Sequence, residues 1–366
     1  MKTESAESLY VHVPFCRTVC AYCDFARQAY REKTADAWLA ALQKELSLRD
    51  IGTYFRTVYI GGGTPTSLNA AQLERLLSIL RPYTLETAEY TCEINPETLD
   101  AQKAGLLKEY GVDRVSVGLQ DIHEDMLRLM NRHHTKEDVQ AAVSLLRENG
   151  INNISLDIMY SLPQQTMGML EETLSFALGL DPDHLSLYSL TIEENSVFGK
   201  KGIEHLDDET EADMYMYLIR RLTDEGYAHY EISNFAKAGK QSLHNRNYWL
   251  YEDFTGVSCG ASGKSGDMRY DNTRSLKEYL EDPLKRQVIL LDEEDRMFET
   301  LMMNLRLREG MELSHFRELN GSDFEDVYGE TAGRLAAKGL LEFGNGRVRC
   351  TERGFFVLND ILEEFL

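Results

Sequence analysis

The sequence predicts an α/β protein in which helices cover a parallel sheet. Three observations indicate this class. Up to about residue 190, six β-rich stretches alternate with amphipathic helical patterns. Hydrophobic residues make up 43% of the 366-residue chain, an ordinary fraction that supplies a sizeable core. From about residue 290 the alternation gives way to helical patterns followed by two short β stretches.

The first three repeats follow from hydrophobic spacing and helix end signals. In order, we predict a strand over 9–13, a helix over 35–48, a strand over 57–60, a helix starting after Asn69, a strand over 90–94 and a helix over 96–111. Asn69 and Gln72 form a capping box, which marks the start of a helix. Gly111 is the expected stop of the third helix, because glycine adopts the left-handed conformation that often ends helices.

The next three repeats complete the pattern. We predict strands over 112–119, 154–160 and 184–190, helices over 121–130 and 135–149, and a further helix between the last two strands. Thr135 and Asp138 resemble a second capping box. Six repeats fit an open or partial barrel as well as a doubly wound sheet. In both architectures the site lies at the carboxyl ends of the strands.

The remainder of the chain is less regular. We predict a helix over 208–226 and then an irregular Gly-, Tyr- and Asn-rich region to about residue 275. The tail is predicted as helices near 293–307, 313–319 and 329–338, β stretches over 340–343 and 347–351, and a final helix. Helices followed by a hairpin resemble a winged helix. We therefore expect three domains: a core barrel over 1–200, an extension over 201–285 and a C-terminal winged-helix-like domain over 286–366.

Charge and hydropathy narrow the possible partners. The net charge is −22 and the tail is not basic, which argues against nucleic-acid binding because phosphate contacts need Lys and Arg surfaces. No apolar run approaches the roughly 20 residues needed to span a bilayer. The polar start, "MKTESAES", lacks the apolar segment of a signal peptide. We therefore expect a cytoplasmic protein that is not embedded in a membrane.

Cys16, Cys20 and Cys23 form a tight cluster directly after the first predicted strand. Structural zinc and a fully ligated iron–sulfur cluster each need four ligands, so three thiolates leave one metal position open. The alternatives are three core thiols that lie close by chance, and a zinc site completed by a distant histidine. Other polar or glycine-rich positions also stand at or just past strand ends: "GGGTP", Glu93, Gln120 and Asp157. This agreement predicts one shared site.

The stretch "CRTVCAYC", with Tyr22 before its third cysteine, resembles the radical S-adenosylmethionine (SAM) superfamily. In that superfamily SAM chelates the open iron of a [4Fe–4S] cluster. The resemblance extends along the chain through "YVHVPFC", "YIGGGTPT", "EINPETL", "VSVGLQ", "SLDIMYSLP", "LSLYSLTIEE", "YEISNFA" and "HNRNYW". It implies a partial (β/α)6 barrel, and it is closest to the coproporphyrinogen-dehydrogenase-like branch and its HemW-type heme chaperones.

The resemblance also implies which residues hold the cofactors. The cluster ligands would be Cys16, Cys20 and Cys23. The SAM contacts would be Tyr10, Tyr22, Gly61, Gly62, Gly63, Thr64, Glu93, Gln120, Arg132 and Asp157. Glycines allow the backbone to approach the methionyl amino group, and a carboxylate such as Glu93 can accept from both ribose hydroxyls. The Arg132 guanidinium suits the methionyl carboxylate.

Two functions remain possible within this branch. One is an oxygen-independent coproporphyrinogen III dehydrogenase, in which a SAM-derived radical decarboxylates propionate chains. The other is a heme chaperone that transfers heme to an acceptor protein, with the cluster, its reductant and SAM supporting or gating transfer. The chaperone is favoured because the dehydrogenases have a fourth cysteine where this chain has Phe25, have a longer arm before the residue matching Tyr10, and lack "HNRNYW". No catalytic residue is therefore assigned.

The "HNRNYW" motif would form the heme region. The resemblance implies His244 as an iron ligand, Asn245 as the residue that orients its ring, and the Tyr248 and Trp249 faces as contacts for the porphyrin. Cys259 is a second candidate ligand. Phe25 is expected to pack against the cluster. Ser161 takes the place of a glycine that is common in relatives.

Overall fold

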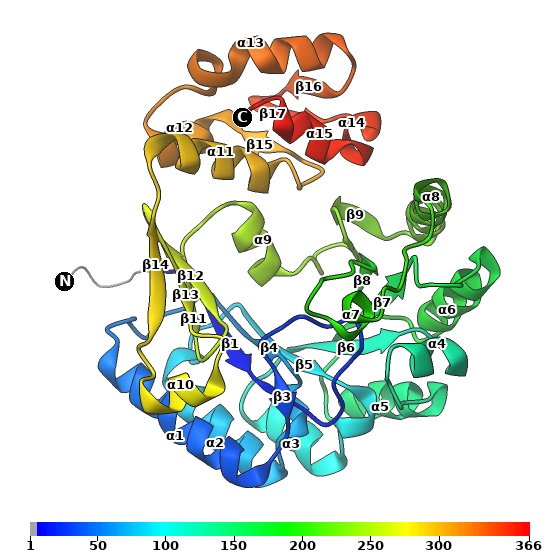
Figure 1. Ribbon diagram of the computed structural model, residues 1–366, viewed down its shortest axis with the longest axis vertical. Helices are drawn as coiled ribbons and strands as arrows, with labels where there is room; N and C mark the ends of the chain where they lie inside the picture. Colours follow the sequence, from blue (N-terminus) through cyan, green and yellow to red (C-terminus); the bar gives the residue numbers. More distant parts are fainter. Residues whose placement is uncertain (1–5) are drawn as a thin grey trace.

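Six parallel strands form the centre of the structure, as the alternation predicts, and they neighbour one another in chain order (Figure 1). They are β1 (Ser8–Val13), β4 (Thr57–Gly62), β5 (Glu89–Ile94), β6 (Arg114–Gln120), β7 (Asn153–Tyr160) and β8 (His184–Ser189). Each pairs in parallel with the next. The computed structural model describes residues 6–366. Most of the polar start that was interpreted as lacking a signal peptide lies outside the described residues.

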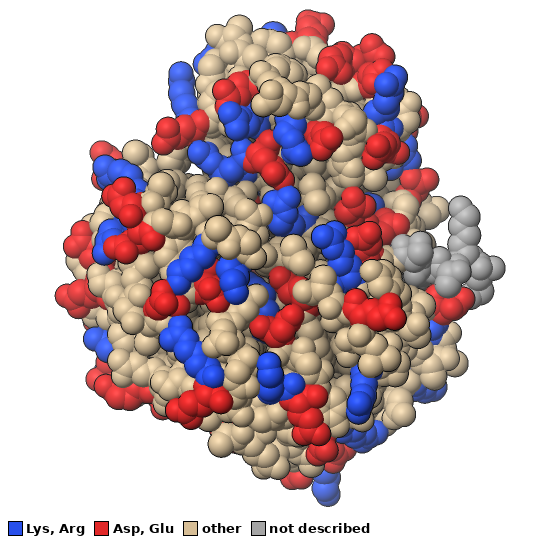
Figure 2. Space-filling view, turned by 180° about the vertical axis from the view of Figure 1, so that it is seen from behind, with Lys and Arg blue, Asp and Glu red and all other residues tan. Residues whose placement is uncertain are grey.

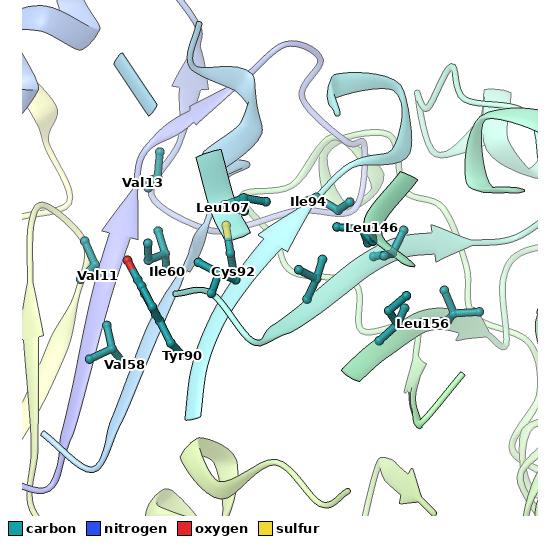
Figure 3. Packing of buried hydrophobic residues seen from close by; sticks show 14 of the residues in the cluster. Val11, Val13, Val58, Ile60, Tyr90, Cys92, Ile94, Leu107, Leu146 and Leu156 are labelled. Atoms are coloured by element: carbon teal, nitrogen blue, oxygen red, sulfur yellow. The ribbon is translucent and has the colours of Figure 1, made fainter. Parts of the chain in front are cut away.

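Helices cover the outer face of these strands (Figure 1). They are α1 (Glu32–Leu48), α2 (Ala70–Leu80), α3 (Ala101–Glu109), α4 (Glu124–Leu129), α5 (Lys136–Glu148) and α6 (Met167–Gly179). Their apolar stripes are buried against the sheet, because amphipathic helices gain stability by removing that stripe from water. In Figure 3, Leu107 of α3 and Leu146 of α5 approach strand residues such as Cys92 and Leu156.

Local end signals explain where these helices begin. Both predicted capping boxes are present, one before α2 and one before α5. The predicted helix over 96–111 is wrong at its start. A 3₁₀ turn over Pro96–Thr98 precedes α3, and the Asp100 carboxylate accepts from the Lys103 amide at 2.9 Å and so caps a new helix.

The region to about residue 275, which was predicted to be irregular, is largely ordered. It contains β9 (Ala228–Glu231), β10 (Asn234–Ala236), α9 (Leu243–Trp249), β11 (Phe254–Val257), β12 (Ser262–Ser265) and β13 (Met268–Asn272). The prediction failed because these elements are short and find distant partners: β11 pairs in parallel with β1, and β10 pairs with β8. Together with β14 (Arg286–Leu290), the five strands of this region extend the six central strands into a twelve-stranded sheet within residues 6–366.

The sheet curves into an open arc, and α9 lies on its concave side (Figure 1). The helices α7 (Val197–Lys200), α8 (Asp208–Asp224) and α10 (Leu276–Glu281) pack around the two ends of the arc. Buried residues of α8, β10, β11 and α10 belong to the same hydrophobic cluster as the six parallel strands. The extension after residue 200 is thus built onto the barrel rather than set apart from it.

The C-terminal part has a core of its own. Its elements are α11 (Glu293–Asn304), β15 (Met311–Glu312), α12 (Leu313–Asn320), α13 (Phe324–Ala337), β16 (Leu341–Gly344), β17 (Arg347–Cys350), α14 (Glu352–Phe356) and α15 (Leu358–Glu363). The helices and the hairpin follow the predicted winged-helix-like order, although α13 starts earlier than expected and the final helix is divided in two. Leu301, Phe316 and Val348 are fully buried in this separate cluster.

Within residues 6–366, no helix combines the length and apolar composition required to cross a membrane. Figure 2 shows acidic and basic side chains interspersed over one face of the barrel and of the C-terminal part.

Candidate cofactor site

A cavity of about 580 Å³ opens at the carboxyl ends of the parallel strands, where the sequence predicts the site. Its size is within the range usual for cofactor pockets. The predicted residues that line it are Cys16, Cys20, Cys23, Tyr22, Gly62, Gly63, Thr64, Glu93, Gln120, Arg132 and Asp157. Tyr10 and Gly61 are not among its lining residues: Gly61 precedes Gly62 in β4, and Tyr10 of the neighbouring strand β1 lies beside the lining residue Tyr59, with ring centroids 6.1 Å apart. The structure therefore brings the predicted cluster and SAM residues together.

Cys16 ends β2 (Phe15–Cys16), and Cys20 and Cys23 lie on the loop that connects it to β3 (Gln28–Ala29). The Ala21 amide donates to the Met130 carbonyl at 2.9 Å and ties this loop to the end of α4. Cys16 is buried, whereas Cys20 and Cys23 are partly exposed. The loop thus turns its thiols toward the cavity.

Polar donors face two of these thiols. The Thr64 hydroxyl lies 3.9 Å from the Cys16 Sγ, and the Arg132 Nη1 lies 3.7 Å from the Cys20 Sγ. The pKa of Cys16 is raised to about 12, chiefly by burial and also by the nearby Cys20, while the Thr64 hydroxyl opposes the shift. Burial also raises the pKa of Cys23. Cys16 and Cys23 therefore favour the protonated thiol in the absence of a metal.

The donor set fits an iron–sulfur cluster. Within residues 6–366, no three His, Cys, Asp or Glu side chains are placed to hold a single metal ion. A cluster of four irons is larger than one ion and accepts thiolates that stand farther apart. The Arg132 cation and the Thr64 hydroxyl would stabilise those thiolates once they form.

The glycines at the end of β4 are required by close contacts. Gly62 has a φ of +104°, and a Cβ there would lie 2.4 Å from the His12 ring. A Cβ on Gly63 would lie 2.6 Å from the Phe15 carbonyl oxygen. The Gly63 amide instead donates to the Val13 carbonyl at 2.7 Å. Only glycine allows β4 to end this close to the cysteine loop.

Glu93, at the end of β5, accepts hydrogen bonds on both carboxylate oxygens. The Tyr59 hydroxyl donates to Oε1 at 2.7 Å, and the Gly62 amide donates to Oε2 at 3.0 Å. Burial raises the pKa of Glu93 to about 7, and these two donors oppose the shift. Tyr59 was not predicted as a site residue, because nothing in "TVYI" distinguishes it from an ordinary strand tyrosine.

Arg132 and Asp157 are also held by neighbours that the sequence did not point to. The Arg132 Nη2 donates to the Gly118 carbonyl at 2.7 Å and to the Asn95 Oδ1 at 3.0 Å. The Ser116 hydroxyl donates to Asp157 at 2.8 Å. Burial raises the pKa of Asp157, and this hydrogen bond opposes the shift.

Two non-glycine residues at strand ends adopt the left-handed conformation, Gln120 with a φ of 63° and Ser161 with a φ of 59°. Such backbone is uncommon outside glycine and is enriched at functional sites. Glycine adopts this conformation without strain, so Ser161 occupies a position that suits glycine. Here the Ser161 hydroxyl donates to Glu211 at 3.0 Å and secures the turn.

His244 lies inside the barrel, and only 1% of its surface is exposed. Its Nδ1 is hydrogen-bonded to the Thr57 hydroxyl and its Nε2 to the Tyr248 hydroxyl, each at 2.8 Å. Its ring stacks on Tyr59, with centroids 5.0 Å apart. The pKa of His244 is lowered to about 3, chiefly by burial and also by the Arg114 cation, so the ring is neutral. Thr57 and Tyr248 therefore hold the ring, where Asn245 was expected to orient it.

The other predicted heme residues do not share one surface. The Tyr248 ring packs edge-on against His244 and Phe254 rather than presenting a free face. The Trp249 ring lies beneath the Arg306 guanidinium, 5.6 Å from its centroid. Cys259 is fully buried in the core near Glu45 of α1 and Tyr279 of α10, apart from His244.

Phe25 lines the rim of the cavity with 66% of its surface exposed. The protein itself therefore does not bury this ring, and its expected packing against the cluster stays a prediction. Phe25 is positioned to contact whatever occupies the cavity mouth.

Two families match the sequence. The radical SAM superfamily matches residues 10–177, and the HemN C-terminal domain matches residues 291–357. The first match spans the cysteine loop and most of the parallel strands, and the second spans most of the separately packed C-terminal part.

Relatives match over the full length. The chain is 36% identical to the heme chaperone HemW of Bacillus subtilis strain 168, covering 98% of this chain and 99% of the relative. It is 34% identical to the heme chaperone HemW of Escherichia coli K12, covering 98% of each. The solved structure of coproporphyrinogen III oxidase (HemN) from Escherichia coli, described as a radical SAM enzyme, superimposes with a TM-score of 0.86 at 25% identity, covering 99% of this chain and 90% of that one.

Proposed function

The chain belongs to the radical SAM superfamily and, within it, to the family of the heme chaperone HemW, and on this premise we propose that it binds heme and passes it to an acceptor protein. The observation that carries the proposal is α9, whose "HNRNYW" sequence lies within the barrel beside the cofactor cavity. Phe25 supports it, because the fourth cysteine typical of the dehydrogenases is missing at this position.

Membership of the superfamily implies a [4Fe–4S] cluster and SAM as cofactors. When bound, the cluster supplies an electron and one iron that is open to the methionyl group of SAM. Cys16, Cys20 and Cys23 would hold the cluster. Glu93 would accept from the ribose, and the Gly61–Gly63 strand end would receive the amino group.

The proposal requires a reductant for the cluster and a protein that accepts heme. It also places the protein in the cytoplasm. The six cysteines are all unpaired in the structure, and free thiols persist in reducing compartments.

Titration with hemin tests the chaperone function. Anaerobically prepared protein is expected to give a saturable shift of the Soret band, and to lose that shift when an apo-acceptor such as apomyoglobin is added. A Soret band identical to that of free hemin at every protein concentration would contradict heme binding.

The alternative is the coproporphyrinogen III dehydrogenase, favoured by the superposition with HemN and by the complete set of predicted SAM residues around the cavity. An anaerobic assay with coproporphyrinogen III, SAM and a reductant separates the two functions. No protoporphyrinogen is expected, and its formation would replace the chaperone function with the enzymatic one.

A further inference from the structure

The SAM region and the heme motif meet at one side chain, Tyr59. Its hydroxyl donates to Glu93 at 2.7 Å, and its ring stacks on His244 at a centroid distance of 5.0 Å with an interplanar angle of 29°. Tyr59 is therefore held from both sides: the carboxylate orients its hydroxyl, and α9 orients its ring.

α9 is firmly seated in this position. The Glu89 carboxylate accepts from the amides of Leu243 and His244 at 2.9 and 3.0 Å, at the start of the helix. The Thr57 and Tyr248 hydroxyls occupy both nitrogens of the His244 ring. A neutral imidazole has a single free lone pair, so its accepting nitrogen is already used by one of these hydroxyls.

Iron ligation by His244 is incompatible with this seated position. A ligating nitrogen must give up its hydrogen bond, and a ring that is 1% exposed must leave the barrel interior to meet a porphyrin. Movement of α9 removes the stack that orients Tyr59. Glu93 then loses one of its two donors, and a buried carboxylate without its donors is costly to keep ionised.

We propose that Tyr59 makes the two sites antagonistic: SAM bound at Glu93 favours the seated α9, and heme ligated by His244 favours the released α9. This inference rests on the proposed function. Linkage is reciprocal, so SAM weakens heme binding by the same factor by which heme weakens SAM binding. SAM thereby acts as a release signal for the carried heme, and Tyr59 is a positioning residue.

The test measures hemin affinity with and without SAM. Cluster-loaded protein is titrated anaerobically with hemin, without reductant so that SAM stays intact. In the wild type, saturating SAM is expected to raise the hemin Kd about tenfold, within the usual range of coupling. In Tyr59→Phe, which keeps the ring but loses the hydroxyl, the ratio of the two Kd values is expected to approach one.

Tyr90→Phe is the matched control. Tyr90 is buried on the neighbouring strand β5, and its hydroxyl has no hydrogen-bond partner among residues 6–366, so its removal should leave the ratio at the wild-type value. Thr57→Val gives a second test, in which hemin affinity should rise. The substitution removes the hydrogen bond to the His244 Nδ1 and leaves the hydrogen bonds of Glu93 in place, so hemin is expected to bind several-fold more tightly.

The possible results distinguish the antagonism from the proposed heme-chaperone function. If the wild-type protein binds no hemin, the chaperone function and the antagonism are both contradicted. If it binds hemin but SAM changes the Kd by less than about twofold, or Tyr59→Phe keeps the full ratio, only the antagonism is overturned. Iron content measured on each variant shows whether the cluster is still loaded.

Discussion

Glu93 lies buried at the end of β5, where Tyr59 and the Gly62 amide donate to its two carboxylate oxygens. Its pKa is raised to about 7, chiefly by burial. The ionised form, which would accept from the ribose hydroxyls of SAM, therefore predominates only above that pH.

We expect SAM affinity to fall as the pH is lowered through 7 toward 6, because protonation removes the acceptor that the ribose needs. Equilibrium dialysis with labelled SAM between about pH 6 and 8.5 measures this profile. Glu93→Gln should bind weakly at all these pH values, with no step near 7. A flat wild-type profile would show that Glu93 does not contact SAM.

The three cysteines of the loop give a second prediction. Replacing Cys16, Cys20 or Cys23 by serine is expected to abolish the cluster, since serine is a poor thiolate substitute and three protein ligands leave none to spare. Iron and sulfide analysis after anaerobic reconstitution measures the loss from about four irons per chain. Cys350→Ser, in the separate C-terminal core, is the control that should keep its cluster. Full iron content in any loop variant would contradict the assignment.

At this scale spacing and resemblance predicted cluster and SAM residues that the fold brings to one cavity, but they did not reveal Tyr59. The role of Tyr59 depends on His244, which is 185 residues later in the chain and reaches it only through the fold. No local pattern carries that information. The same holds for Ser116 and Asn95, which hold Asp157 and Arg132.

Among the elements, α9 depends on a carboxylate from a distant strand. Glu89 of β5 is 4% exposed and accepts from two amides at the start of α9, close to the buried Arg114 cation. Glu89→Gln is expected to lower the free energy of unfolding by ~1.5–3 kcal/mol, the usual worth of hydrogen bonds to a charged group. Urea unfolding measures it. The exposed Glu86→Gln is the matched control, and equal stability of both variants would refute the capping role.

The sequence predicted elements best where their ends carry local chemistry. Asn69 with Gln72, and Thr135 with Asp138, form the capping boxes that start α2 and α5. It failed where pairing is distant, because β11 is stabilised by β1 rather than by its own short sequence. The helix predicted over 96–111 failed for another reason. The Asp100 carboxylate accepts from the Lys103 amide, which a continuous helix would use for its own backbone hydrogen bond.

For the whole molecule, six alternating repeats correctly predicted the parallel strands but left open an open or partial barrel and a doubly wound sheet. The strands neighbour one another in chain order from β1 to β8, without the reversal of a doubly wound sheet, and antiparallel strands continue the sheet at both ends. The described residues form three hydrophobic clusters: one for the arc and its helices, a smaller one beside the cysteine loop that includes Met130 and Phe198, and one for the C-terminal part.

Because the C-terminal part has a hydrophobic core of its own, a core substitution there should destabilise that part without affecting the cofactor site. Phe316→Ala removes a fully buried ring from the C-terminal core and is expected to destabilise that part by ~3–5 kcal/mol. SAM and cluster binding should be unchanged, because no residue of this part lines the cavity. Calorimetry with and without SAM measures both effects. A parallel loss of SAM binding would show that the two parts unfold as one unit.

β1, which leads directly into the cysteine loop, lies in the middle of the finished sheet between β4 and β11. During synthesis its partner β4 emerges early, but β11 is made 246 residues after its counterpart in β1. At usual translation speeds that interval lasts roughly 10–50 s. Throughout it, one edge of β1 is unpaired and open to misassociation with other nascent chains. It follows that β1, which leads into the cysteine loop, gains its second neighbouring strand only when translation has passed residue 254.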